Sequence, residues 1–206
     1  MSIEVNKEKM SWLLDGCLVQ VVASNEWLGC RILPLSVDQL RWKPRSGRWS
    51  IAACLDHLNR TFSYYIPKIE DALDREGNMR SRTHRPGFTE LEEHFLKQME
   101  PPSLVTMSAP TALVPASAVD PDEIVEQFPV LRARFAAAVR SIAGVDVLGV
   151  SVPDSLHPPV QSLGGVIGLL SAHERRHLWQ AQQVLSAPEF PADLAAKSIL
   201  DDCRGR

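Results

Sequence analysis

The chain has 206 residues, of which 45% are hydrophobic and 23% are charged, with a formal net charge of -3 at pH 7. This composition is typical of one globular domain over residues 1–206, and it excludes a disordered or fibrous protein. Acidic residues outnumber basic ones, so we expect no nucleic acid partner, and we interpret the Arg-rich run 79–85 as a solvated loop. No apolar run reaches the roughly 18 residues of a membrane span, so we expect no membrane partner.

Cysteine usage and the N-terminus indicate the compartment. The four cysteines form no C-x-x-C pair, and MSIEVNKEKM lacks the apolar core of a signal peptide. We therefore expect reduced thiols and a cytoplasmic protein.

Apolar periodicity predicts two long helices in the first part of the chain. The first runs from about Val5 to Cys30, and the connector after it has room for one short turn at 36–40. The second follows Ser50, a predicted N-cap, and runs from Ile51 to about Arg75 with a bend expected from Pro67.

A long irregular segment from Asn78 to Val119 separates these helices from the next. It contains one short amphipathic helix, TELEEHFLKQM, followed by a connector rich in Pro, Ser and Ala. We expect this segment to cross over the folded helices as a long loop.

The third long helix has the clearest start signal. Asp120 supplies an N-cap oxygen, Pro121 occupies the first helical position, and Glu123 completes a capping-box arrangement. We expect this helix to run to about Ala143 and to stop at Gly144.

The fourth long helix is predicted to begin after Ser162 and to end before Pro188, with a short terminal helix in 191–206. Four helices of roughly 20 to 26 residues, no alternating strand pattern and long connectors indicate an all-α fold. We predict a four-helix bundle with crossover connections.

Two histidines interrupt the apolar stripe of the fourth helix. In LLSAHERRHLWQAQQVL, His173 and His177 share a face with Leu170 and Val184. Two buried imidazoles each need partners, since an unpaired buried polar group costs roughly 1 to 3 kcal/mol. Either carbonyls and carboxylates satisfy them as ordinary core residues, or both rings bind one divalent metal.

Together with RWSIAACLDHLNRT, residues 48–61, the histidine motif resembles the DinB-like superfamily of metal-binding four-helix bundles. That family has a Trp-Ser start to its second helix, a His one to two turns later, and H-x-x-x-H-x-x-Q in its fourth helix. The matching residues are Trp49, Ser50, His57, His173, His177 and Gln180. The resemblance spans roughly residues 5 to 187.

The resemblance implies a metal site made of His57, His173 and His177. Three neutral nitrogens suit Zn²⁺ or Ni²⁺ and leave positions open for water or substrate, as in catalytic sites. Periodicity disagrees about His57, which falls roughly 130° from the centre of its helix's apolar stripe and therefore reads as a surface residue. Either Pro67 and a second neighbouring helix change which face is buried, or the site lies at an open edge of the bundle.

Several residues near the site have a plainer interpretation. We expect no metal or catalytic role for His84, His94 or His157, which fall in loops or on the short helix. Asp56 and Glu174 point about 100° away from the neighbouring ligands, which favours pairing in solvent or with ligand-supporting groups.

Other residues beside the histidines leave two alternatives open. Gln180 either hydrogen-bonds a ligand or bound water, or makes an interhelical contact. Arg175 and Arg176 either form surface ion pairs with Glu174 or the acidic tail, or fix an anionic substrate. We interpret Trp49, Trp179 and Cys54 as packing residues, although Cys54 would lie near the metal.

The family includes thiol-dependent S-transferases and isomerases, and members labelled metal-dependent hydrolases. The resemblance implies a divalent metal, Zn or Ni, that lowers the pKa of a bound thiol or water. Because no general base is evident beyond the ligands, we favour a metal-dependent thiol S-transferase acting on a small-molecule substrate with a low-molecular-weight thiol. The alternatives are a metal-dependent hydrolase and a non-catalytic metal-binding or stress-response protein. A homodimer formed through helix faces is a further alternative.

Overall fold

The computed structural model describes residues 2–45, 47–78, 87–102, 107–116, 120–142, 144–152 and 156–191. Its elements are α1 (Ser2–Arg31), α2 (Val37–Arg41), α3 (Ile51–Asn78), α4 (Glu90–Met99), the 3₁₀ turn η1 (Thr111–Leu113), α5 (Pro121–Arg140) and α6 (Leu163–Leu185). Within those ranges there is no strand, only one isolated bridge between Ser151 and Ser162. The prediction of an all-α fold is therefore confirmed.

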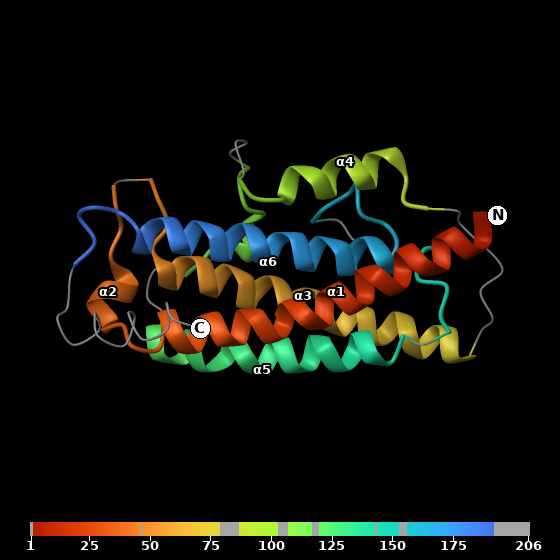
Figure 1. Cartoon of the computed structure of the whole chain (residues 1–206), viewed down its shortest axis with the longest axis horizontal. Helices are drawn as coiled ribbons and strands as arrows, with labels where there is room; N and C mark the ends of the chain where they lie inside the picture. Colours follow the sequence, from red (N-terminus) through yellow and green to blue (C-terminus); the bar gives the residue numbers. More distant parts are fainter. Residues whose placement is uncertain are drawn as a thin grey trace.

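The four long helices form a bundle in which α1 and α3 do not pack directly on each other to any large extent. Each of them packs against both α5 and α6, which gives the order α1, α5, α3, α6 around the core. In Figure 1, α3 and α5 run in the same direction, and α1 and α6 run in the opposite one. The chain must therefore return along the whole bundle between α3 and α5, which is the predicted crossover.

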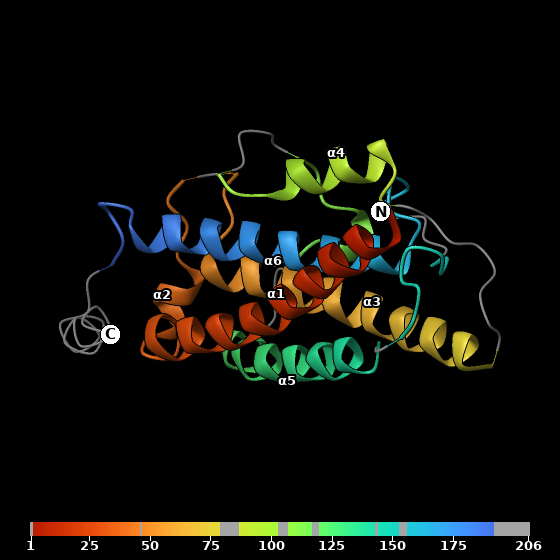
Figure 2. The same ribbon diagram turned by 45° about the vertical axis from the view of Figure 1, so that its right-hand side comes forward.

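The returning segment contributes α4 and η1 to the outside of the bundle. Figures 1 and 2 both show α4 lying along α6, and residue contacts join the same two helices. The turn η1 packs on α3 instead. These two short elements build walls beside one face of the α3–α6 pair.

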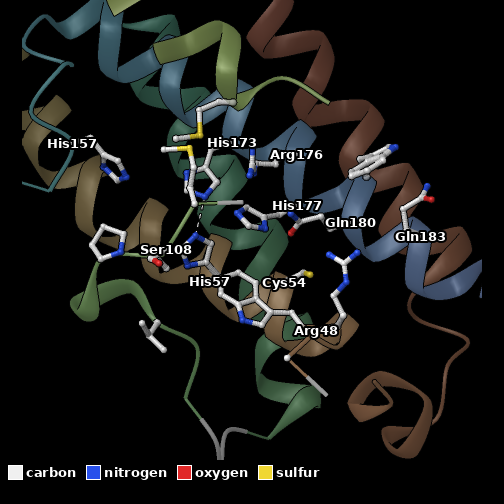
Figure 3. Close-up of a pocket in the computed structure, with 18 of the residues that line it drawn as sticks. Arg48, Cys54, His57, Ser108, His157, His173, Arg176, His177, Gln180 and Gln183 are labelled. Atoms are coloured by element: carbon white, nitrogen blue, oxygen red, sulfur yellow. Dashed lines mark hydrogen bonds between the residues drawn. The ribbon is translucent and has the colours of Figure 1, made fainter. Parts of the chain in front are cut away.

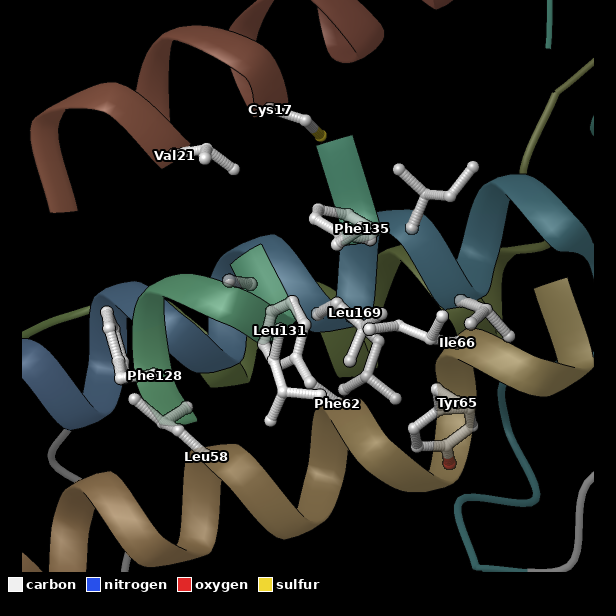
Figure 4. Close-up of a cluster of buried hydrophobic side chains, with 14 of the residues drawn as sticks. Cys17, Val21, Leu58, Phe62, Tyr65, Ile66, Phe128, Leu131, Phe135 and Leu169 are labelled. Atoms are coloured by element: carbon white, nitrogen blue, oxygen red, sulfur yellow. The ribbon is translucent and has the colours of Figure 1, made fainter. Parts of the chain in front are cut away.

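The bundle core combines aromatic packing with one buried ion pair. Phe62 of α3 and Phe135 of α5 meet edge to face, with ring centroids 5.2 Å apart (Figure 4). Arg132 lies one turn before Phe135 and donates to the carboxylate of Glu174 on α6 at 2.7 Å. Its guanidinium also lies over the rings of Phe62 at 3.5 Å and Phe128 at 4.1 Å.

The helix starts follow the predicted caps more closely than the helix ends do. Ser50 accepts a hydrogen bond from the backbone N–H of Ala53 at 3.2 Å. Asp120 accepts from the N–H of Asp122 at 3.1 Å, so the capping box predicted with Glu123 does not form. Helix α5 ends at Arg140, earlier than predicted, because the chain enters a turn there.

Helix α3 extends three residues beyond its predicted end and continues through Pro67 to Asn78. Most of the predicted terminal helix, residues 192–206, and the Arg-rich run 79–85 lie outside the described residues. Among the helices that the structure describes, none is both long enough and apolar enough to cross a membrane. The cytoplasmic location and the homodimer stay predictions.

A buried carboxylate fixes the start of α6. Glu92 of α4 is 1% exposed and accepts hydrogen bonds from the backbone N–H groups of Gln161 and Ser162, both at 3.2 Å. It also accepts from the Ser162 hydroxyl at 2.9 Å, and that hydroxyl oxygen in turn accepts from the N–H of Gly165 at 2.9 Å. Its other oxygen caps α4 through Thr89 at 3.0 Å. One side chain thus holds α4 against the helix that carries two of the three histidines.

Candidate metal centre

The three histidines predicted as metal ligands are far apart in the sequence but meet between α3 and α6. His57 comes from α3, His173 and His177 come from α6, and each offers one nitrogen within 4.8 Å of the others. The side chains point toward one another in Figure 3. All three residues are buried, at 2%, 4% and 5% exposure. The helical spacing of four residues on α6 explains the pair, and the packing of α3 on α6 adds the third ring.

The periodicity argument that placed His57 on the surface is wrong. The turn η1 covers that face of α3, and Leu113 within it is 2% exposed. Asp56 helps to fix the covering segment, because its carboxylate accepts a hydrogen bond from the backbone N–H of Ala116 at 2.8 Å and pairs with Arg60 at 2.9 Å. A helix that is covered on more than one side buries residues outside its main apolar stripe.

The backbone of η1 also determines which nitrogen of His57 faces the cluster. The Nδ1 atom lies 2.6 Å from the carbonyl oxygen of Leu113, and since a carbonyl only accepts, Nδ1–H is the donor. The neutral ring then has its lone pair on Nε2, which lies 2.8 Å from Nε2 of His173. A carbonyl that orients a histidine in this way is the usual support of a metal ligand.

The two histidines of α6 have nitrogens that no described group satisfies. Nδ1 of His173 and Nδ1 of His177 are buried and have no hydrogen-bond partner in the described part of the chain. Burial lowers the pKa of both rings well below its usual value, with further lowering from the neighbouring imidazoles and Arg176. Burial also lowers the pKa of His57, partly opposed by the bond to Leu113.

These observations fit a divalent cation. Neutral imidazoles with available lone pairs are good ligands for Zn²⁺ and Ni²⁺, and an ion that takes a lone pair from each ring offsets part of the cost of burying them. The group can therefore hold a divalent metal. Three ligands leave further positions open to an exogenous molecule.

Two residues next to the cluster behave as packing residues. The indole of Trp49 stacks on His177, with centroids 5.4 Å apart and an interplanar angle of 22°, and it also contacts His57 at 4.9 Å. Cys54 is 1% exposed, and burial raises the pKa of its thiol to about 12. A thiol with that pKa stays protonated, so it is a poor ligand at neutral pH.

A cavity of about 860 Å³ opens beside the histidines. Its volume is in the range of small-molecule sites. His57, His173, His177 and Gln180 line it, and Gln180 hydrogen-bonds to His177. Of the two alternatives for Gln180, the structure thus favours contact with a candidate ligand.

The cavity includes one histidine to which the sequence assigned no role. His157, in the connector before α6, is 7% exposed and lines the cavity. Its Nδ1 lies 2.6 Å from the hydroxyl of Tyr65, and its ring contacts that of His173 with centroids 6.3 Å apart. Nothing in the local sequence signals this position, because an irregular connector has no periodicity.

The charged residues of α6 have different partners from those predicted. Glu174 pairs with Arg132 inside the bundle, so it neither faces solvent nor supports a ligand. Arg175 pairs with Glu100 of the segment after α4. Arg176 lines the cavity and donates to the carbonyl oxygen of Gln98 at 3.1 Å. Arg132 could have been found in the sequence, since it falls within the apolar stripe of its helix.

The remaining histidines lie away from the cluster or outside the described residues. His94 is on an exposed part of α4, where its Nε2 lies 2.8 Å from Gln98. Trp179 of α6 is half-buried and lines the cavity, and its role as a packing residue stays a prediction. His84 lies outside the described residues.

Comparison with known proteins connects this geometry to a family. A family model described as the DinB superfamily matches residues 31–181, a range that contains the Trp-Ser motif and all three clustered histidines. No curated protein and no solved structure matches the chain. Since the family match covers well over half of the sequence, the chain belongs to the DinB superfamily.

Proposed function

We propose that this protein is a metal-dependent enzyme in which His57, His173 and His177 hold one divalent ion, and that it catalyses a thiol S-transferase-like reaction in the adjoining cavity. The observation that carries the proposal is the buried three-histidine cluster at the edge of an 860 Å³ cavity. Membership of the DinB superfamily supports it independently. The ion, when bound, would lower the pKa of a thiol or water so that the nucleophile is available at neutral pH.

The protein's own groups prepare the site in two ways. The Leu113 carbonyl holds His57 in the tautomer whose Nε2 lone pair faces the other rings. Trp49 packs against the rings of both His177 and His57. Both contacts reduce the reorganisation needed before a ligand binds.

The side chains that line the cavity favour a thiol over water as the nucleophile. No carboxylate is among the described residues that line it, so an Asp or Glu general base is missing there. A free thiol has a pKa of about 8.5, whereas that of water is about 15.7, so a thiol needs far less assistance to lose its proton. A hydrolase, whose nucleophile is water, would depend more on a general base than a thiol transferase would.

The first experiment measures metal content. Purified wild-type protein, His57→Ala and His177→Ala are analysed for bound metals, with His94→Ala as a control because that histidine is exposed on α4. We expect about one equivalent of Zn²⁺ or Ni²⁺ in the wild type and the control, and strong loss in the other two. Equal metal content in all four proteins would contradict the site.

The second experiment tests catalysis. The wild type is loaded with Zn²⁺, Ni²⁺ or Mn²⁺ and incubated with a panel of small thiols and an aromatic electrophile, and thiol consumption is followed. We expect turnover that needs both metal and thiol and that His57→Ala abolishes. Stable metal binding without thiol-dependent turnover for any metal would favour the non-catalytic alternative.

A further inference from the structure

Among the described residues, the charged groups that line the cavity all have the same sign. Three arginines, Arg45, Arg48 and Arg176, contribute to its wall, and no Asp or Glu does so among the described residues. The protein as a whole is acidic, with a net charge of -3. The concentration of cations at this cavity is therefore a local feature that the overall composition does not explain.

The three arginines differ in depth. Arg176 is only 5% exposed and lies beside the histidines in Figure 3, whereas Arg48 and Arg45 are exposed at the rim. Arg176 directly precedes His177 in the sequence, and the two side chains line the same cavity. An arginine stays charged at any ordinary pH, so this part of the cavity is permanently cationic.

Three buried or half-buried carboxylates of the neighbouring segments pair with other arginines. Glu174 pairs with Arg132, Asp56 pairs with Arg60, and Glu100 pairs with Arg175. None of these carboxylates lines the cavity. A divalent ion at the histidines would add two positive charges to the same space, and buried charge of one sign is costly unless a counter-charge accompanies it.

The rest of the wall is mixed, with Ser108, Gln180 and Gln183 among its polar residues. Its apolar part is formed by aromatic, thioether and aliphatic side chains, including Phe95, Met99, Leu156, Trp179 and Val184. Apolar walls with a few charged groups select a ligand that has a hydrophobic body and an ionised end. Arginine in particular suits carboxylate and phosphate, because its planar fork of donors matches their oxygens.

We propose that the cavity binds a small-molecule substrate with a carboxylate or phosphate group on an apolar body, with Arg176 holding the anion inside and Arg48 attracting it at the rim. This inference rests on the proposed function, since it names the substrate class of the same site. Arg175, its neighbour in the sequence, has no such role because Glu100 engages it.

The test compares matched probes by calorimetry. The probes are 3-phenylpropionate, phenyl phosphate and the neutral 3-phenylpropionamide, each titrated into metal-free and Zn²⁺-loaded protein whose metal content is measured in the same samples. We expect the better of the two anions to bind at least about tenfold more tightly than the amide, as is reasonable for one charged hydrogen-bonding group. Which anion binds more tightly distinguishes a carboxylate site from a phosphate site.

Three variants separate the arginines from the general charge of the protein. Arg176→Gln should abolish the preference for the anion, and Arg48→Gln should reduce it. Arg140→Gln, an exposed change of equal charge on α5, should leave it intact. If burial of Arg176 makes its variant unfold, as circular dichroism would show, the Arg48 variant still tests the proposal because Arg48 is exposed.

Each outcome has a definite meaning. Equal binding of anion and amide, no millimolar binding of either anion, or an anion preference that Arg176→Gln and Arg48→Gln leave unchanged would overturn the inference. If the anion preference holds in a protein that takes up no metal, the proposed function fails and the anion site stands. If metal binds but the preference is missing, the metal centre stands and the anion site fails.

Discussion

Replacing Glu174 by Gln is expected to destabilise the bundle strongly without removing the histidine cluster. The carboxylate accepts from Arg132 at 2.7 Å, and the two side chains are 1% and 0% exposed. It also accepts from Gln20 of α1 at 3.0 Å, so one carboxylate joins three helices. The terminal nitrogens of Arg132 have no hydrogen-bond partner among the described residues, so its charge depends on Glu174 and on the faces of Phe62 and Phe128.

The magnitude follows from this burial. Neutralising one partner of a buried pair costs about 3–5 kcal/mol, because the other charge is left without compensation. A chain of this size loses roughly 2–4 °C of Tm per kcal/mol, which predicts a fall of roughly 6–20 °C. Urea unfolding followed by circular dichroism measures the free energy directly. Metal content should be retained, since Glu174 points into the bundle and away from the cavity.

A matched control and a double variant decide whether the buried charge is the cause. Glu70→Gln breaks the ion pair with Arg134 at 2.5 Å, whose side chains are about half exposed, and should change stability little. Arg132→Met combined with Glu174→Leu removes both charges and should recover much of the loss. The reasoning fails if Glu174→Gln costs no more than Glu70→Gln, or if the double variant is as unstable as the single one.

Three further predictions concern pH and packing. Burial tends to raise the pKa of Glu92, but the hydrogen bonds that the carboxylate accepts lower this pKa overall. The ionised carboxylate therefore stabilises the fold at neutral pH, and this stabilisation is lost as the pH falls from about 4.3 through the folded pKa. Glu92→Gln should lose stability at pH 7 and show a flatter dependence of Tm on pH in acid. Because the pKa of His173 and His177 is lowered in the fold, these rings take up protons at a higher pH in the unfolded chain than in the folded one. Metal-free protein should therefore lose stability as the pH falls below about 6.5. A series of Tm measurements in chelator that shows no such loss would contradict the burial of both histidines as neutral rings. A Cβ at Gly165 would lie 2.7 Å from the Glu92 carboxylate, so Gly165→Ala should lower the free energy of unfolding in urea by about 1–3 kcal/mol. As a control, a Cβ at Gly16 would have nothing within 4 Å, so Gly16→Ala should raise the free energy of unfolding by up to about 1 kcal/mol.

Helix positions were the most predictable part of the fold. Apolar spacing and caps such as Ser50, Asp120 and Ser162 are local signals, and the helices begin where those signals predict. Helix ends were less predictable, as α5 shows by stopping at Arg140, because a helix end depends on contacts that the following turn makes. The crossover could be expected from connector length, but the packing of α4 on α6 and η1 on α3 could not.

The site was predictable in part. His173 and His177 could be placed together because four residues make about one helical turn. His57 was predicted as a ligand only from the resemblance to a family motif, whereas the periodicity of its own helix placed it on the surface. His157 and the partners of Arg176 had no local signal, since connectors and side-chain contacts across the bundle leave no period in the sequence.

By itself, the sequence determined the all-α class, the four long helices, the inward face of His173 and His177, and the motif that marks the DinB superfamily. All of these depend on residue spacing within one helix or on a short local pattern. Only the tertiary structure decided that η1 buries His57, that Leu113 sets its tautomer, and that Arg176 faces the cavity while Glu174 turns into the core. Those outcomes depend on which elements meet across the bundle, and contacts between distant segments are set by the packing of the whole chain.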